Sequence, residues 1–244
     1  MSGGVGPSKD IGGLHGEEHE QEQQQQPTAR KPDGRRWSLG LRHLNCLALC
    51  IVLAASGTVS PWDLAFVAFA ALYMLFISRA SFPPRRPGPE PTVFDRNNRA
   101  LGLYVQFAAV VGLYLPIAYI LEGVYEGDKA GVNAAAPHLF LLAAQVFMEG
   151  VAFSGQFSTP VRAFVPVFYN SRRIATIIEW LGNEFGETGE ELYGVPRRRL
   201  YVGRGLAIAN MALWSFNLLG FLVPVYLPRV FKGYYSYPSN KSKD

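Results

Sequence analysis

The chain contains five long blocks made almost entirely of apolar residues, with polar segments between them. The clearest block covers residues 136–155 and contains a single acid, Glu149. A helix rises 1.5 Å per residue, so blocks of about 16 to 25 residues can cross a ~30 Å hydrocarbon layer. A soluble domain would instead distribute its apolar residues as short periodic stripes. The blocks therefore predict an all-α, multi-pass helical membrane bundle.

We expect this helical membrane domain to cover residues 37–235 and to contain about five transmembrane helices. They are predicted at residues 41–58, 61–78, 101–121, 136–155 and 205–227. Ser60, Pro61 and Asp63 are the residue types that begin a helix, so they predict the start of the second span. Pro116 and Pro224 are expected to interrupt the third and fifth spans. Ala108 and Gly112 give the third span a small-residue face for close helix packing.

Polar tails flank this domain. Residues 1–36 are low in complexity and lack aromatic residues, so they are predicted to be disordered. Residues 236–244 form a polar C-terminal tail. His15 to His19 fit an H-x-x-E-H zinc pattern, but a Gly- and Gln-rich tail does not supply the stable helix that such a site needs.

One amphipathic helix is predicted at about residues 171–186, between the fourth and fifth spans. Ile177 and Leu181 recur at helical spacing opposite Arg173 and Glu179. An interfacial helix on the membrane surface and a helix that caps the spans both fit this pattern. The interfacial reading gives candidate contacts to lipid phosphates at Arg172, Arg173, Arg197, Arg198 and Arg199.

Lys and Arg residues predict the orientation. They concentrate before the first span and in the segments 79–99 and 156–204, which places the N-terminus in the cytosol. Five spans would put the basic C-terminal tail on the opposite side, so either the first hairpins fix the topology or the last block is re-entrant. The net charge of +4 follows from these flanks, and we expect no nucleic acid partner. The acidic N-terminal tail favours an endomembrane or the plasma membrane over the chloroplast.

The apolar blocks contain a few polar side chains that could act together. His138, Gln145 and Glu149 share one face of the fourth span, and Asn210 and Asn217 mark a polar face of the fifth. One interpretation is a polar path centred on Glu149, which would carry a proton or contact a ligand. The other is a set of hydrogen bonds between helices. We favour the second interpretation at this stage, because no second charge is expected inside the membrane with Glu149.

Signatures of enzymes are missing from the sequence. It has no G-x-S-x-G nucleophile motif, no Cys/His pair in a catalytic setting and no pair of carboxylates at catalytic spacing. His138 stands alone, which suits capping or interface placement better than metal binding. We therefore expect neither catalysis nor a cofactor.

Several long strings resemble one family. They include SGTVSPWDLAF at 56–66, LPIAYILEGVYEGDK at 115–129, APHLFLLAAQVFMEGVAFS at 136–154 and LYVGRGLAIANMALWSFNLLGFLVPVYLPR at 200–229. RHLN at 42–45 and RAFVPVFYNSRRI at 162–174 belong with them. Together they resemble plant multi-pass membrane proteins defined by a domain of unknown function, over about residues 37–235. The resemblance implies a plant origin and a helical membrane domain, and it carries over no catalytic residue or cofactor.

Two functions follow as expectations. The first is a non-catalytic scaffold, or partner-binding membrane subunit, that acts through its long cytosolic loops. The alternative is a small-solute or proton-coupled transporter or channel that uses Glu149. A homo-oligomer is expected for the second, since five short spans enclose little volume.

Overall fold

A computed structural model describes residues 40–84, 93–94, 98–153, 157–186 and 196–236, all within one compact unit formed by residues 37–244. The predicted disordered tail, residues 1–36, lies outside the described residues. Residues 237–244 of the predicted C-terminal tail do so as well. Every element within the described ranges is a helix, which confirms the all-α prediction.

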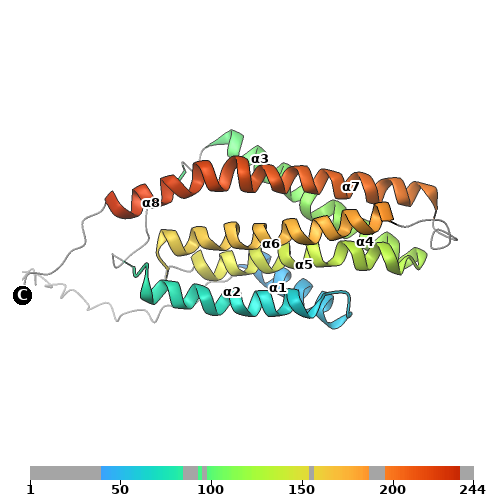
Figure 1. The fold of residues 1–244 in the computed structure, drawn as a ribbon, viewed down its shortest axis with the longest axis horizontal. Coiled ribbons are helices and arrows are strands. Elements are labelled where there is room, and N and C mark those ends of the chain that lie inside the picture. Colours follow the sequence, from blue (N-terminus) through green and yellow to red (C-terminus); the bar gives the residue numbers. More distant parts are fainter. Residues whose placement is uncertain (1–39, 85–92, 95–97, 154–156, 187–195, 237–244) are drawn as a thin grey trace, which may run out of the picture. The chain divides into compact units, whose positions relative to one another are not determined.

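These helices form six rods (Figure 1). Four are uninterrupted: α1 (Leu41–Ala55), α2 (Pro61–Ala80), α5 (Lys129–Phe153) and α6 (Thr159–Gly186). The other two each join two α-helices through a π-helical segment. One consists of α3 (Arg99–Ala109), η1 (Val110–Tyr114) and α4 (Leu115–Glu126), and the other of α7 (Arg197–Ser215), η2 (Phe216–Tyr226) and α8 (Leu227–Ser236).

Four of the described rods are long and apolar enough to cross a membrane: Pro61–Ala80, Arg99–Glu126, Lys129–Phe153 and Arg197–Ser236. They contain the second to fifth predicted blocks. The first block forms α1, which is apolar but has only 15 residues. Rods of this kind are those expected of a membrane-embedded protein.

The starts of two helices follow from local residues. In α2, the Ser60 side chain accepts a hydrogen bond from the Asp63 amide and Pro61 occupies the first turn, as predicted. α5 begins seven residues earlier than the predicted span, because Asp128 caps it by accepting from the Gly131 amide at 2.9 Å. His138, predicted near a helix start, is therefore well inside α5.

Helices α5 and α6 form the centre of the bundle. They pack on each other, and Figure 1 shows them between α2 and α7. α5 also contacts α1 and α4, whereas α6 also contacts η2 and α8. Large exposed apolar side chains lie mainly on α1, α2, the α3–α4 rod and the α7–α8 rod. The peripheral rods thus present an apolar surface, and the central pair is enclosed by protein.

Helix α6 departs from the sequence expectation. The predicted amphipathic helix of residues 171–186 is the second half of a 28-residue helix that runs along α5. Arg173 and Thr176, on the predicted polar face, are buried, whereas Ile178 on the predicted apolar face is exposed. Trp180 of the same helix is fully buried. The buried face of α6 is therefore mixed, because it carries Arg173, Thr176 and Trp180 beside apolar Ile177, while Glu179 is exposed.

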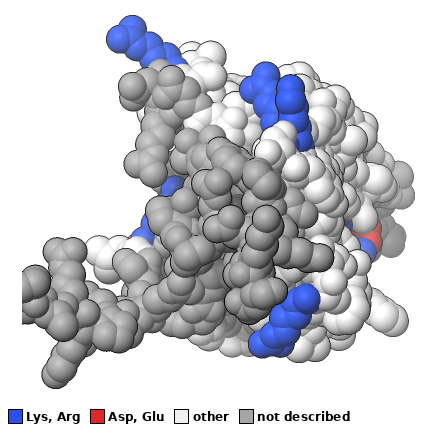
Figure 2. Space-filling view, turned by 90° about the vertical axis from the view of Figure 1, so that its left-hand side faces the viewer, with Lys and Arg blue, Asp and Glu red and all other residues white. Residues whose placement is uncertain are grey.

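The helix also divides the segment 156–204 between the two ends of the bundle. One end, here called the basic end, has Arg42, Arg79, Arg99, Arg162, Arg229 and Lys232 near helix termini. Figure 2 looks at this end, where Lys and Arg dominate the described charged surface. The other end, the cap end, holds the α1–α2 turn, the α4–α5 link and the start of α7. Arg162 and Arg197 are therefore at opposite ends of the bundle.

Candidate functional site

The interior polar chemistry begins with the two predicted helix interruptions. Pro116 and Pro224 each follow a glycine by four residues, Gly112 and Gly220, and each rod is π-helical there. Proline has no N–H, so the carbonyl four residues earlier loses its helical donor. His138 of α5 donates from Nε2 to the Gly112 carbonyl at 3.0 Å. Side chains from neighbouring helices thus complete the hydrogen bonding of η1.

Trp214 of α7 lies against this interruption. A Cβ on Gly112 would lie 2.5 Å from the Trp214 ring, so the glycine permits the close approach that the small-residue face predicted. The indole donates to Asn210 Oδ1 at 3.1 Å, and Asn210 Nδ2 donates to the Val111 carbonyl at 3.1 Å. The Trp214 carbonyl accepts from Asn170 of α6 at 3.1 Å. A buried polar layer therefore joins η1, α6 and α7.

Arg173 of α6 lies in the same layer with 0% of its surface exposed. Its Cζ lies 4.1 Å from the centre of the Trp214 ring, which is a cation–π geometry. Nη2 donates to Gln145 Oε1, and Gln145 Nε2 donates to Glu149 Oε1 at 2.7 Å. A buried arginine is thereby linked to Glu149 through one amide side chain.

Arg172, the residue before Arg173, forms an ion pair with a different acid. Arg172 lies 2.8 Å from Asp63 of α2, whose side chain is 2% exposed, while that of Arg172 is 27% exposed. We call Arg172, Arg173, Asp63 and Glu149 the charge layer. Its two arginines and two acids balance, so the layer is neutral when both acids are ionised.

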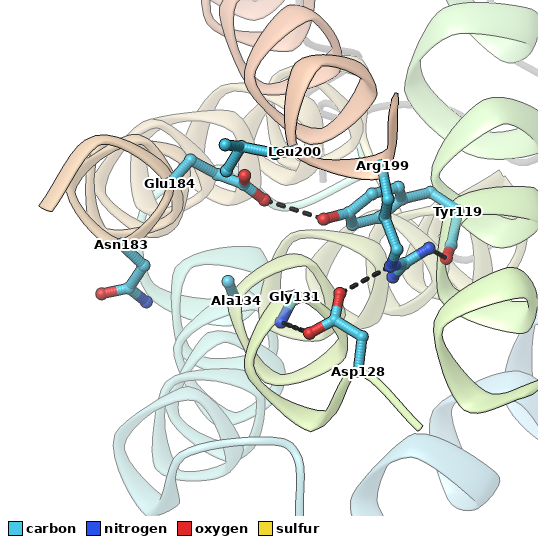
Figure 3. Close-up of a pocket in the computed structure, with 8 residues that line it drawn as sticks. All are labelled: Tyr119, Asp128, Gly131, Ala134, Asn183, Glu184, Arg199 and Leu200. Atoms are coloured by element: carbon cyan, nitrogen blue, oxygen red, sulfur yellow. Dashed lines mark hydrogen bonds and ion pairs between the residues drawn. The ribbon is translucent and has the colours of Figure 1, made fainter. Parts of the chain in front are cut away.

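A second polar cluster lies at the cap end (Figure 3). It consists of Tyr119, Asp128, Glu184 and Arg199, and we call it the cap cluster. Buried Arg199 donates to Asp128 Oδ2 at 2.6 Å and to the Tyr119 carbonyl at 2.9 Å. The Tyr119 hydroxyl donates to Glu184 Oε1 at 2.9 Å. Four helix segments thus meet through charged and hydroxyl groups.

Glu184 is the titratable centre of the cap cluster. Trp180 Nε1 donates to the same oxygen, Oε1, at 3.1 Å. The residues of the cluster surround a small cavity of about 10 Å³, the size of a single water molecule.

Glycines make room for this cluster. A Cβ on Gly203 would lie 2.6 Å from both Glu184 carboxylate oxygens, and one on Gly131 would lie 2.6 Å from the Tyr119 hydroxyl. On Gly123, a Cβ would overlap Arg199 Nη2. Three different helices therefore carry a glycine where the polar groups converge.

An aromatic stack connects the two polar regions. The rings of His138 and Trp180 lie 5.9 Å apart at 29°, between the layer around Arg173 and the Glu184 carboxylate. The described polar groups thus extend along the axis of the bundle, from Glu149 near the end of α5 to Arg199 at the start of α7.

The predicted polar face is only partly brought together. Gln145 and Glu149 bond to each other, and His138 bonds to η1 instead. Asn217 accepts from Tyr104 at 2.9 Å, and neither Asn210 nor Asn217 contacts Glu149 by a hydrogen bond. A second charged side chain nevertheless lies near Glu149 within the bundle, because α6 brings buried Arg173 beside Gln145.

Two predicted lipid contacts are also corrected. Arg173 and Arg199 are buried and bonded to protein, so they are not positioned to meet lipid phosphates. Arg172 is half-buried and paired with Asp63. Arg197 and Arg198 are exposed, with Arg198 paired to Glu122. For these two, contact with lipid phosphates stays a prediction.

Sequence reasoning missed several residues of the site: Asp63, Tyr119, Asp128, Asn170, Glu184 and Trp214. A signal for some of them existed, because Asn170, Arg173, Thr176, Trp180 and Glu184 follow each other at spacings of three or four. Such a stripe marks one helix face that carries polar and aromatic groups. Within the described ranges, no three His, Cys, Asp or Glu side chains are grouped as metal ligands.

Comparison with known proteins gives a family and no further relative. Neither the curated proteins nor the solved structures contain a match to the chain. A family model described as "Domain of unknown function (DUF7733)" matches residues 39–235, which is most of the chain and the whole helical bundle. This match confirms the resemblance to a domain of unknown function, while the plant origin stays a prediction. The chain belongs to the DUF7733 family.

Proposed function

We propose that this chain is an integral membrane protein with six crossing helices that transports a small solute together with protons. The observation that carries the proposal is the charge layer in the interior of an apolar bundle. Ionisable residues inside a membrane are costly and usually mark ion or substrate pathways. The proposal includes no catalytic step.

Helix α6 is the sixth crossing in this proposal. It is too polar to qualify by hydropathy, but it is 28 residues long and packs along α5. None of its residues from Thr159 to Asn170 is exposed. Polar side chains are tolerated at membrane depth when they face protein partners instead of lipid. The enclosure of α6 therefore supports a crossing that composition alone does not.

Six crossings also remove the conflict in the orientation. An even number places both termini on one side. Six described Lys and Arg side chains lie at the basic end and five at the cap end, namely Lys129, Arg197, Arg198, Arg199 and Arg204. The sequence adds further Lys and Arg residues before α1, between α2 and α3 and after α8, all of which adjoin helix ends at the basic end. The positive-inside rule makes that side cytosolic. Arg229 and Lys232 of α8, which contradicted a five-span topology, then agree with the rule.

Buried Arg173, a second charge near Glu149, changes which of the two functions we favour. A structural role for Glu149 was favoured because it was expected to be the lone charge among the spans. Replacing buried ion pairs by apolar residues is often neutral or stabilising, so stability alone is a weak reason to retain a charge layer. Proton transport would explain why the charges are retained. Glu149 can take up and release a proton, and Arg173, linked to it through Gln145, compensates the negative charge of the ionised carboxylate.

The test is flux into vesicles that contain the reconstituted full chain and an internal pH dye. With an imposed pH gradient and a panel of small solutes outside the vesicles, the wild type should take up protons together with at least one solute. Glu149→Gln should abolish this flux while leaving the melting temperature close to that of the wild type. Glu179→Gln is the matched control, since Glu179 is exposed on α6 and should be dispensable. Equal flux in wild type and Glu149→Gln would refute the proposal.

A scaffold is the second candidate function. The observation that favours it is the basic end, where several arginines and a lysine face outward near the two termini (Figure 2). Such a surface suits an acidic protein partner or anionic lipid. In this case Glu149→Gln would leave function intact, whereas replacing Arg229 and Lys232 by glutamine would release the partner. The organelle and homo-oligomerisation stay predictions under either function.

A further inference from the structure

Buried polar atoms without a partner concentrate around Trp214. Among the described residues they include Asn170 Oδ1, Arg173 Nε, Arg173 Nη1 and His138 Nδ1. All three side chains are fully buried, at 1% exposure or less. A buried group that lacks a hydrogen bond costs about 1–3 kcal/mol. Several such groups in one place indicate a site that a ligand completes.

Each of these side chains contacts Trp214, two at its ring and one at its backbone carbonyl. Arg173 Cζ lies 4.1 Å from the centre of the Trp214 ring, and the His138 ring centre lies 6.3 Å from it. Asn170 is fixed there by its bond to the Trp214 carbonyl. The site therefore offers a cation with two free nitrogens, a free amide oxygen and flat aromatic walls.

The groups around Trp214 suit an anionic ligand that can also donate a hydrogen bond. Arg173 takes an anionic oxygen, for which its planar guanidinium is well suited. Asn170 Oδ1 accepts a hydrogen bond from a hydroxyl or amino group of the ligand. Since the surrounding groups are fully buried, the ligand is small. We propose that this site binds a small carboxylate that also carries a hydroxyl or amino group; this rests on the proposed transport function and names its substrate class.

Charge balance couples this ligand to a proton. The charge layer is neutral with both acids ionised, so a bound carboxylate adds one uncompensated negative charge in a region of low dielectric. Protonation of Glu149 removes that charge. The titratable and charged neighbours of Glu149 are Arg173 of α6, Arg42 and Cys46 of α1 and Tyr226 of η2. Arg42 is exposed, so it compensates less than buried Arg173. One proton therefore enters with each carboxylate.

L-lactate is the probe, because it carries a carboxylate and a hydroxyl, and lactamide is its uncharged counterpart. Calorimetric titration of the purified full chain in two buffers of different ionisation heat gives both the affinity and the number of protons taken up. The wild type should bind lactate with uptake of about one proton and should not bind lactamide. Asn170→Ala should weaken lactate roughly five- to tenfold, through loss of one hydrogen bond.

Two further variants separate the roles of the charges. Glu149→Gln should bind lactate with no proton uptake, which a merely structural role for Glu149 would not produce. Arg173→Gln should lose lactate binding, and Arg198→Gln, an exposed arginine at the cap end, should retain it.

The inference is overturned if lactate does not bind, if lactamide binds equally well or if lactate binds without a proton. Proton flux that depends on Glu149 with no lactate binding would overturn this inference and leave the transport proposal standing. If neither Glu149-dependent proton flux nor lactate binding is observed, this inference and the transport proposal are both overturned.

Discussion

Gly203 and Gly205 lie two positions apart on α7 but have different surroundings. A Cβ on Gly203 would lie 2.6 Å from both oxygens of Glu184 and from the Tyr119 hydroxyl. Gly205 is exposed, and a Cβ there would meet nothing within 4 Å. Alanine at either position makes the same change in the same helix. Only alanine at position 203 should overfill the cap cluster.

The expected energies have opposite signs. Alanine is favoured over glycine in a helix interior by about 1 kcal/mol, so Gly205→Ala should stabilise the protein by about that amount. At Gly203 the same gain is opposed by about 1–3 kcal/mol of overpacking. Separation of Tyr119 from Glu184 removes a 2.9 Å hydrogen bond worth about 1 kcal/mol or more. We therefore expect Gly203→Ala to lower the free energy of unfolding by about 1–3 kcal/mol.

Thermal unfolding of the purified chain in detergent measures this difference. One kcal/mol shifts the Tm of a chain of this size by about 2–4 °C, so the two variants should differ by about 4–16 °C. Trp180, which donates to Glu184, provides a local fluorescence signal. Equal helix content by circular dichroism is the control for gross misfolding. If Gly203→Ala melts at or above the temperature of Gly205→Ala, the described packing of the cap cluster is wrong.

Two further predictions concern other parts of the bundle. Gly112→Ala should lower the Tm through its clash with Trp214, whereas Gly102→Ala on the same rod, with open space around it, should not. Ser60→Ala should cost about 1 kcal/mol by removing the cap of α2, seen as a Tm lower by about 2–4 °C.

The apolar helices could be predicted because their cause is local. A segment in hydrocarbon must satisfy its own backbone hydrogen bonds, so a long apolar block can only be helical. The start of α2 was predictable for the same reason, since Ser60 and Pro61 act within one turn. Gln145 and Glu149, four apart on one helix, also follow from spacing alone.

Partners far apart in the sequence could not be predicted in this way. Arg173 is 28 residues from Gln145, and Arg172 is 109 residues from Asp63. Only the packing of α6 on α5 and α2 brings these groups together. The cap cluster has the same origin, because Tyr119, Asp128, Glu184 and Arg199 come from four segments. The role of the glycines that make room for the cap cluster can be recognised only once the positions of the helices are known.

Under the proposed arrangement of six crossings, the position of α6 follows from the membrane as solvent. In a soluble bundle the most apolar helix occupies the centre, because water satisfies polar groups at the surface. In hydrocarbon only protein can satisfy Arg173 and Asn170, so the helix that carries them has to be enclosed. Enclosure also removes the water that would screen the charge of Arg173, which makes its interaction with Glu149 or with a bound anion stronger. The fold of α6 and the proposed transport chemistry therefore have one physical cause: the need to hold charged groups inside an apolar bundle.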